Sequence, residues 1–216
     1  YVVTRASNAV VVDPEVDLTL LGPLGCGIQT GSGTVLNRLK PVIGESIVVF
    51  GCGAVGLSAI MAAKLTGCSQ IIAVDIHASR LALARELGAT HQINGKEQDA
   101  VAVIKQITGK GAHYAVETTG VSAIVLQAVH AVKPLGTVAI VGFTGVQNDL
   151  MAEGKSLVGV IEGDAVPALF IPLLVQLYKQ GKFPIDKLIA RYPLADINQA
   201  FADSASGKVI KPVVVM

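Results

Sequence analysis

The stretch "VVFGCGAVG" (residues 48–56) constrains the fold of this chain more than any other feature of its sequence. It places Gly51, Gly53 and Gly56 in G-x-G-x-x-G spacing, between an apolar run that predicts a strand and a periodic run that predicts a helix. The first glycine permits a tight turn, the second lets a pyrophosphate approach the backbone, and the third lets the helix lie close to the sheet. The amides at the helix N-terminus then face the phosphates. We therefore expect a strand–loop–helix unit that binds a dinucleotide.

An acidic residue follows at the spacing that such a unit requires. Asp75 ends the second predicted strand, nineteen residues beyond Gly56. A carboxylate there accepts hydrogen bonds from both ribose hydroxyls and repels a 2′-phosphate, which predicts NAD rather than NADP. The alternative is that Asp75 caps the helix that begins near His77. Arg80 either packs beside the adenine or reaches a phosphate, or is an ordinary solvated helix arginine.

Strand-like and helix-like segments alternate regularly from Ile47 onward. The short runs rich in Val and Ile are typical of strands that are buried on both faces. The alternation predicts an α/β fold, a Rossmann-type doubly wound six-stranded parallel sheet with flanking N- and C-terminal segments. The predicted strands are Ile47–Phe50, Ile71–Asp75, His91–Ile93, His113–Glu117, Thr137–Gly142 and Ser156–Ile161. The predicted helices between them are Val55–Leu65, Ser79–Leu87, Asp99–Ile107 and Ala123–Val132.

Glycine and proline mark where these helices should end and where the flanking segments begin. We expect the helices to stop at Gly67, at Gly88, at Gly109 and at the Pro134–Gly136 pair. Before the sheet, a small helix is expected over Gly27–Leu39, and after the sheet a helix over Val166–Gln180. The closing stretches "KLIARYPL", "ADINQAFADSAS" and "VIKPVVVM" predict strand, helix and strand. They do not continue the alternation, so we expect them to pack outside the large sheet.

Charge and cysteine content exclude several classes of partner. The chain has 17 basic and 16 acidic residues, whereas nucleic-acid and anionic-membrane surfaces need a basic excess. No apolar run reaches the roughly 18 residues of a membrane span. Three cysteines without regular spacing do not form a disulfide framework, and free thiols fit a reducing cytoplasm. We expect a cytoplasmic protein that binds neither nucleic acid nor membrane.

Other chemistry-bearing residues give weaker signals. The four histidines, His77, His91, His113 and His130, show no metal-binding spacing and are interpreted as ordinary hydrogen-bonded residues. Two of the cysteines, at positions 52 and 68, are interpreted as inert small apolar residues. Cys26, alone in "GPLGCGIQTG", is either a small buried side chain, a thiol at a helix N-terminus or a functional ligand. S-Adenosylmethionine-dependent methyltransferases share the glycine-rich turn and the acid, and they are the rival interpretation of the motif.

Longer stretches resemble one family. "GPLGCGIQTGSG", "VVFGCGAVGLSAIMAAKLTG", "IIAVDIHASRLALARELGAT" and "VETTG" resemble the zinc-dependent medium-chain alcohol dehydrogenases, above all their aryl-alcohol (benzyl-alcohol) branch. The C-terminal "GVIEGDAVPALFIPLLVQLYKQGKFPIDKLI" is similar to the same branch. The resemblance covers essentially the whole chain. It implies an enzyme that uses zinc and NAD to oxidise a primary, aromatic alcohol to the aldehyde by hydride transfer. The alternative is a non-catalytic dinucleotide-sensing or partner-binding module.

The resemblance also implies roles for individual residues. Cys26 matches a ligand of the catalytic zinc, and Thr30 matches a threonine that contacts the nicotinamide. Lys211 falls where many relatives carry an arginine that pairs with the pyrophosphate, and lysine keeps the charge but lacks the bidentate fork. The remaining expected cofactor contacts are Ala54, Val55, Thr118 and, through their backbone at the carboxamide, Val141 and Phe143.

The resemblance sets the expected organisation. The chain begins at Tyr1 in mid-pattern, which suggests part of a longer protein whose GroES-like catalytic domain precedes it. We expect residues 1–26 to be the tail of that domain, 27–161 to be the NAD-binding domain, and 162–216 to be a C-terminal segment that packs with the catalytic domain. In the family the other zinc ligands and the proton relay lie in that catalytic domain. This chain alone is therefore expected to bind cofactor without catalysis, with Cys26 free of metal. Relatives also suggest a homo-oligomer, a dimer or tetramer, paired through the strand near Ser156–Val160.

Overall fold

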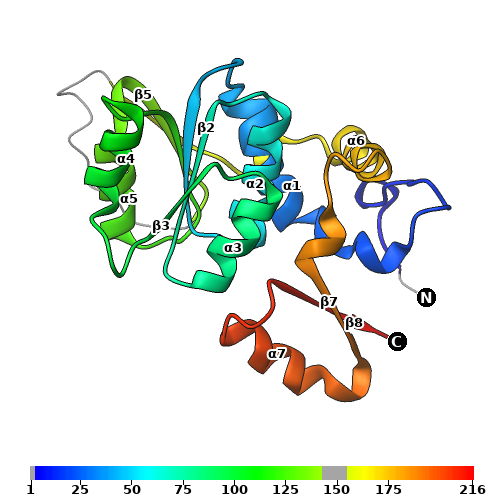
Figure 1. The fold of residues 1–216 in the computed structure, drawn as a ribbon. Helices are drawn as coiled ribbons and strands as arrows, with labels where there is room; N and C mark the ends of the chain where they lie inside the picture. The colour runs from blue at the N-terminus through cyan, green and yellow to red at the C-terminus, as the bar shows by residue number, and fades with distance from the viewer. Residues whose placement is uncertain (1–2, 143–154) are drawn as a thin grey trace.

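A six-stranded parallel sheet forms the centre of the computed structural model, which describes residues 3–142 and 155–216 (Figure 1). The strand order is β3-β2-β1-β4-β5-β6. The two halves of such a sheet meet between β1 and β4, and ligands bind there, outside the carboxyl ends of the strands. The predicted doubly wound fold is confirmed. The strands are β1 (Ser46–Phe50), β2 (Gln70–Asp75), β3 (His91–Asn94), β4 (Ala112–Glu117), β5 (Val132–Ile140) and β6 (Ser156–Gly159).

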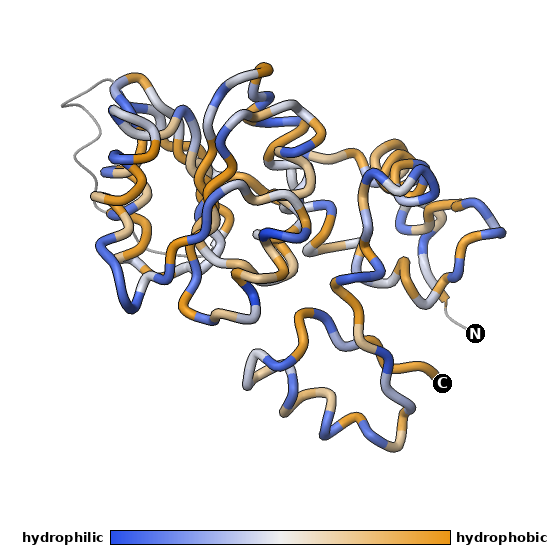
Figure 2. Tube along the Cα trace, in the orientation of Figure 1, coloured by the Kyte–Doolittle hydropathy of each residue, from blue (hydrophilic) through white to orange (hydrophobic). Residues whose placement is uncertain are grey.

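Helices cover both faces of this sheet. Figure 1 shows α2 (Ala54–Leu65) and α3 (Ala78–Leu87) on one face, and α4 (Ala100–Thr108) and α5 (Ser122–Ala131) on the other. Successive side chains of a strand point to opposite faces, so Ile47 and Val49 of β1 pack in one hydrophobic cluster, and Val48 and Phe50 pack in the other. Burial of each such side chain contributes about 1.5–3 kcal/mol. Figure 2 shows the hydrophobic residues concentrated along these strands.

The predicted helix ends are confirmed at three positions and wrong at one. Gly67, Gly88 and Gly109 all adopt positive φ just after a helix, as glycine C-caps do. The Pro134–Gly136 pair does not stop α5, because that helix ends at Ala131 and β5 begins at the next residue. The partners of β5 on β4 jump from Ala112–Val132 to Tyr114–Thr137. The residues between them form a bulge inside β5, which accommodates proline and a Leu135 with φ of 64°.

Two helical segments flank the sheet on the side of α2. The helix α1 (Gly27–Gly33) continues into a π-helical turn over Thr34–Leu39, so the predicted segment is helical throughout but changes its hydrogen-bonding pattern. α6 (Pro167–Lys179) follows the large sheet and contacts α1. Both helices lie between the Rossmann-type layers and the N-terminal segment in Figure 1. Cys26 directly precedes α1, at the junction of these parts.

The C-terminal stretches form strand, helix and strand outside the large sheet, as their sequence predicted. β7 (Ile189–Pro193) and β8 (Lys211–Val215) make a two-stranded parallel sheet, with α7 (Ile197–Ala205) between them in sequence. Tyr192, Gln199 and Lys208 donate hydrogen bonds to the carboxylate of the buried Asp203, which joins the strand, helix and turn of this unit. Within residues 3–142 and 155–216, no helix is long and apolar enough to cross a membrane.

Candidate functional site

A cleft of about 660 Å³ opens at the carboxyl edge of the large sheet, where β1, β2 and β4 end. It lies at the switch point between the two halves of the sheet, the position where open α/β sheets bind ligands. The structure brings nine of the predicted site residues together in its lining: Cys26, Gly51, Gly53, Ala54, Val55, Asp75, Arg80, Thr118 and Lys211. These residues come from the segment before α1, the glycine loop, the first turn of α2, the ends of β2 and β4, α3 and β8.

The three motif glycines occupy three different environments. Gly51 has φ of +92°, so the tight turn after β1 requires glycine. A Cβ on Gly56 would lie 1.8 Å from the carbonyl oxygen of Gly51, so α2 packs directly onto the loop there. A Cβ on Gly53 would meet no protein atom within 4 Å, and Gly53 lines the cleft. The missing side chain of Gly53 therefore leaves space for a ligand rather than for the protein itself.

Asp75 is a buried carboxylate whose oxygens are largely occupied by backbone amides. Its Oδ2 accepts a hydrogen bond from the amide of Cys52 at 2.6 Å, and its Oδ1 accepts from the amides of Ile76 and His77 at 2.7 and 2.9 Å. A carboxylate oxygen accepts about two hydrogen bonds, so one position remains, on Oδ2. α3 begins at Ala78 and has no side-chain cap, so Asp75 supports the turn before the helix and does not cap it. Its free lone pair is available to a ribose hydroxyl.

Positive groups converge on the same cleft. Arg80 and Lys211 line it, and neither makes an ion pair with any part of the chain that the structure describes. The Nε of Arg80 is buried and has no hydrogen-bond partner there. The N-terminal turn of α2 carries no side-chain cap, so its amides are free to bind an anion. Asp75 is the one carboxylate among the described lining residues, which leaves the cleft with an excess of positive charge.

The residues of the cleft fit a dinucleotide but do not by themselves fit a zinc ion. An open glycine, an uncapped helix N-terminus and an unpartnered buried guanidinium nitrogen all provide for a phosphate-bearing ligand. Cys26 is exposed and lines the cleft. A catalytic zinc needs about three protein ligands. No group of three or more His, Cys, Asp or Glu side chains that could hold a metal occurs among residues 3–142 and 155–216.

Three predicted contacts among the described residues lie outside the lining. Thr30 is buried in α1, where its hydroxyl donates to the carbonyl of Cys26 at 2.8 Å. Gly56 is covered by the glycine loop. The amide of Val141 donates to the carbonyl of Glu117 at 2.9 Å, which fixes the end of β5 beside β4. Phe143 lies outside the residues that the structure describes.

Sequence reasoning missed two carboxylates near the site. Glu117 ends β4 as Asp75 ends β2; it is fully buried and accepts hydrogen bonds from the amides of Thr119 and Gly120 at 2.7 and 3.2 Å. Its place at a strand end was a usable signal, since parallel strands end at the same edge. Glu162 contacts α1 from a turn more than 130 residues away, and no local pattern predicts such a pairing.

The two other cysteines are unsuited to chemistry, as predicted. Cys52 is fully buried, and burial together with the nearby Asp75 carboxylate raises the pKa of its thiol. Burial likewise raises the pKa of Cys68, which is half-buried. A thiol whose pKa is raised carries less thiolate and reacts slowly. Cys26 is the exposed cysteine.

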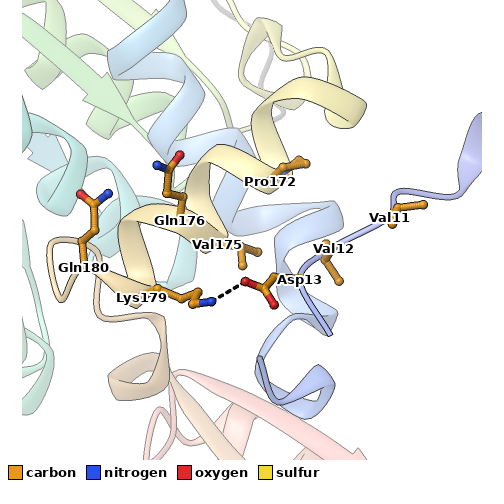
Figure 3. Close-up of a pocket in the computed structure, with 8 residues that line it drawn as sticks. All are labelled: Val11, Val12, Asp13, Pro172, Val175, Gln176, Lys179 and Gln180. Carbon is orange, nitrogen blue, oxygen red and sulfur yellow. Dashed lines mark hydrogen bonds and ion pairs between the residues drawn. The ribbon is translucent and has the colours of Figure 1, made fainter. Parts of the chain in front are cut away.

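A second hollow, of about 430 Å³, lies between the N-terminal segment and α6 and contains none of the predicted site residues (Figure 3). Its wall includes Val11, Val12, Pro172 and Val175. Its two charged side chains, Lys179 and Asp13, pair with each other, and Lys179 also contacts Glu15 at 3.1 Å. This pairing lowers the pKa of Asp13 and raises the pKa of Lys179. The two charged side chains of this hollow are therefore already paired within the chain.

Similar proteins are dehydrogenases. A geraniol dehydrogenase of Castellaniella defragrans is 42% identical over all of this chain and 60% of its own length. The crystal structure of a benzyl alcohol dehydrogenase from Acinetobacter calcoaceticus matches with a TM-score of 0.95 and 51% identity, over 98% of this chain and 60% of that one. An alcohol dehydrogenase zinc-binding domain protein from Burkholderia ambifaria matches with a TM-score of 0.94, 52% identity and coverage of 98% and 59%.

This chain therefore spans about 60% of the length of the relatives that it matches. A family model described as "Zinc-binding dehydrogenase" matches residues 54–179, which include Gly56 at the end of the glycine motif, Asp75 and the strands β2 to β6 of the large sheet. The match favours the dehydrogenase interpretation of the glycine loop over the methyltransferase one. By this match and by its resemblance to alcohol dehydrogenases over its whole length, the chain belongs to the zinc-binding dehydrogenase family.

Proposed function

We propose that this chain is the NAD-binding portion of a zinc-dependent dehydrogenase that oxidises a primary, aromatic alcohol to the aldehyde. The observation that carries the proposal is the single cleft that holds the glycine loop, Asp75, Lys211 and Cys26. NAD and zinc are the cofactors of the family. The whole-protein activity is inferred, because the chain covers about 60% of its relatives.

Each part of the cleft has a distinct task in this proposal. The first turn of α2 and Lys211 bind the pyrophosphate, and Gly53 leaves the space for it. The remaining lone pair of Asp75 accepts a ribose hydroxyl, and its charge repels a 2′-phosphate. Cys26 lines the same cleft, so the cofactor would lie beside its thiol. When bound, NAD accepts the hydride of the alcohol.

Cys26 is proposed as one ligand of the catalytic zinc in the full-length protein. Cys26 lines the cofactor cleft, so its thiol would hold the zinc beside the bound cofactor. This chain contributes that one ligand, so we propose that it binds cofactor without catalysis. Zinc-dependent alcohol oxidation by the 216 residues alone would contradict that statement.

A titration tests cofactor binding directly. Addition of the chain to NADH should enhance or shift the nicotinamide fluorescence with saturation, and NAD should displace the NADH. NADPH should bind at least tenfold more weakly, which corresponds to about 1.4 kcal/mol. S-Adenosylmethionine should not compete. Equal affinity for NADPH would overturn the role of Asp75, and no saturable NADH binding would overturn the proposed function.

The substrate proposal rests on the named relatives. The benzyl alcohol dehydrogenase and the geraniol dehydrogenase are named for primary alcohols whose carbinol carbon adjoins an unsaturated carbon. In the full-length protein loaded with zinc, kcat/KM for benzyl alcohol should therefore exceed that for butanol. Geraniol serves as the comparison that separates an aromatic preference from a general preference for unsaturated alcohols.

The edge of the large sheet offers a surface for assembly. β6 is an edge strand of the large sheet, and an edge strand has unpaired amides and carbonyls that can pair with another copy. We propose a homo-oligomer that forms through this edge, which sedimentation equilibrium can test.

A cytoplasmic location is proposed from the free thiols and the balanced charge.

A further inference from the structure

Three consecutive residues, Glu162, Gly163 and Asp164, form a left-handed turn between β6 and α6. Their φ angles are 48°, 69° and 48°. Left-handed backbone costs a non-glycine residue roughly 1–2 kcal/mol, so glycine would be the cheaper choice at positions 162 and 164. Residues held in such conformations cluster at functional sites, where their side chains are needed. The two acidic side chains of this turn therefore call for an explanation.

The side chain of Glu162 joins the turn to α1. Its Oε2 accepts a hydrogen bond from Nε2 of Gln29 at 3.0 Å and lies 3.4 Å from the hydroxyl of Thr30. Gln29 is only 2% exposed, so this contact is made by a buried amide. The orientation of the amide is fixed by its partners, because Nε2 faces two acceptors and Oε1 could donate to neither.

The side chains of Gln29 and Thr30 hold the two backbone carbonyls that flank the Cα of Cys26. Nε2 of Gln29 also donates to the carbonyl of Gly25 at 2.9 Å, and the hydroxyl of Thr30 donates to the carbonyl of Cys26 at 2.8 Å. Cys26 has φ of −141° and ψ of −98°, which is neither helical nor extended backbone. Contacts thus run from Glu162 through α1 to the residue that borders the cleft.

The turn itself is anchored without the carboxylate of Glu162. Nδ2 of Asn37 donates to the carbonyl of Gly163 at 3.1 Å, and Arg38 pairs with Asp164 at 3.5 Å. The backbones of Gly33 and Gly163 touch, since a Cβ on either would lie 2.4 Å from a backbone oxygen near the other. A substitution at position 162 should therefore leave the turn in place and remove only its contact with α1.

We infer that Glu162 is a positioning residue that, through Gln29, fixes the carbonyl of Gly25 and with it the backbone of Cys26, and so directs the thiol toward the cofactor cleft. The importance of this positioning for catalysis rests on the proposed role of Cys26 as a zinc ligand. The positioning itself is a property of this chain and can be measured without metal or substrate.

The test is the rate at which iodoacetamide alkylates Cys26, followed by mass spectrometry of the peptide that contains it. Glu162→Gly relieves the backbone strain and removes the contact, so the rate should rise at least threefold while Tm stays equal or rises. Glu162→Gln keeps an acceptor oxygen but loses the charge, and it should react within about twofold of the wild-type chain. Asp164→Gly is the matched control, because it alters the same turn on the side that faces Arg38. It should leave the rate unchanged.

Two results would overturn the inference. Equal rates for the Glu162→Gly, Asp164→Gly and wild-type chains would show that Glu162 does not hold Cys26. Equal acceleration in Glu162→Gln and Glu162→Gly would assign the effect to the lost charge and not to positioning. NADH titration of the wild-type chain is run in parallel. Failure of that binding with an intact rate effect would remove the proposed function and leave the positioning role standing.

Discussion

Oδ2 of Asp75 accepts a hydrogen bond from the amide of Cys52 at 2.6 Å, so the acid at the end of β2 is tied to the middle of the glycine loop after β1. The two halves of the sequence motif are therefore joined before any ligand binds. The same oxygen keeps the one acceptor position of the carboxylate that is free. The shape of the loop and the proposed recognition of the ribose thus depend on the same oxygen atom.

Replacement of Asp75 by asparagine should affect both stability and cofactor choice. An asparagine amide turns a donor toward at least one backbone N–H, and an unsatisfied buried donor costs about 1–3 kcal/mol. NADH affinity should fall at least tenfold, and the preference for NADH over NADPH should narrow. Fluorescence titration and thermal unfolding measure these effects. Asp186→Asn, at an exposed acid outside the cleft, is the control and should change neither.

Two glycine-to-alanine substitutions in the same loop should have opposite consequences. Gly56→Ala places a Cβ 1.8 Å from the carbonyl oxygen of Gly51, so the chain should lose about 1–3 kcal/mol or more in its free energy of unfolding. Gly53→Ala meets no atom within 4 Å, and its φ of −79° suits alanine, so Tm should stay unchanged.

The affinity for NADH distinguishes these two variants further. The Cβ of Gly53→Ala enters the space proposed for the pyrophosphate, so NADH affinity should fall at least tenfold in a chain that is fully folded. Chemical denaturation and NADH titration of both variants separate the two effects. Unchanged NADH binding by Gly53→Ala would contradict the assignment of the cleft.

Features that depend on residues close together in the sequence were predicted, whereas features that depend on contacts between distant residues were not. The glycine loop, Asp75 and the strand alternation are local patterns, and the structure places them as predicted. The bulge over Lys133–Gly136 was missed because a proline–glycine pair after a helix looks like a stop, and only the pairing with β4 shows otherwise. The contact of Glu162 with Gln29 depends on how α1 packs against a distant turn, which no spacing encodes.

The three thiols should differ strongly in reactivity. Cys26 is exposed, whereas the pKa values of the buried Cys52 and the half-buried Cys68 are raised, mainly by burial. One thiol per folded chain should therefore react rapidly with a disulfide reagent, and Cys26→Ser should abolish that phase. Because Cys26 borders the proposed cofactor cleft, saturating NADH should slow the reaction severalfold. Rapid reaction that persists in Cys26→Ser would contradict this ranking.

His113 should make stability depend on pH at the opposite edge of the sheet. Burial and the nearby charge of Lys133 lower the pKa of His113 from its ordinary 6.5, and Glu45 opposes them only weakly. Its Nδ1 accepts the amide of Ser46 at 3.2 Å, which requires the neutral ring. The folded chain therefore binds the proton less readily than the unfolded chain, so the contribution of His113 is complete above about pH 6.5 and is lost as pH falls through the lowered pKa. Wild-type Tm should fall more steeply from pH 7.5 to 5 than that of His113→Asn, whose amide oxygen can accept the same bond without titrating. Parallel plots of Tm against pH for the two proteins would exclude His113 as the source of the pH dependence.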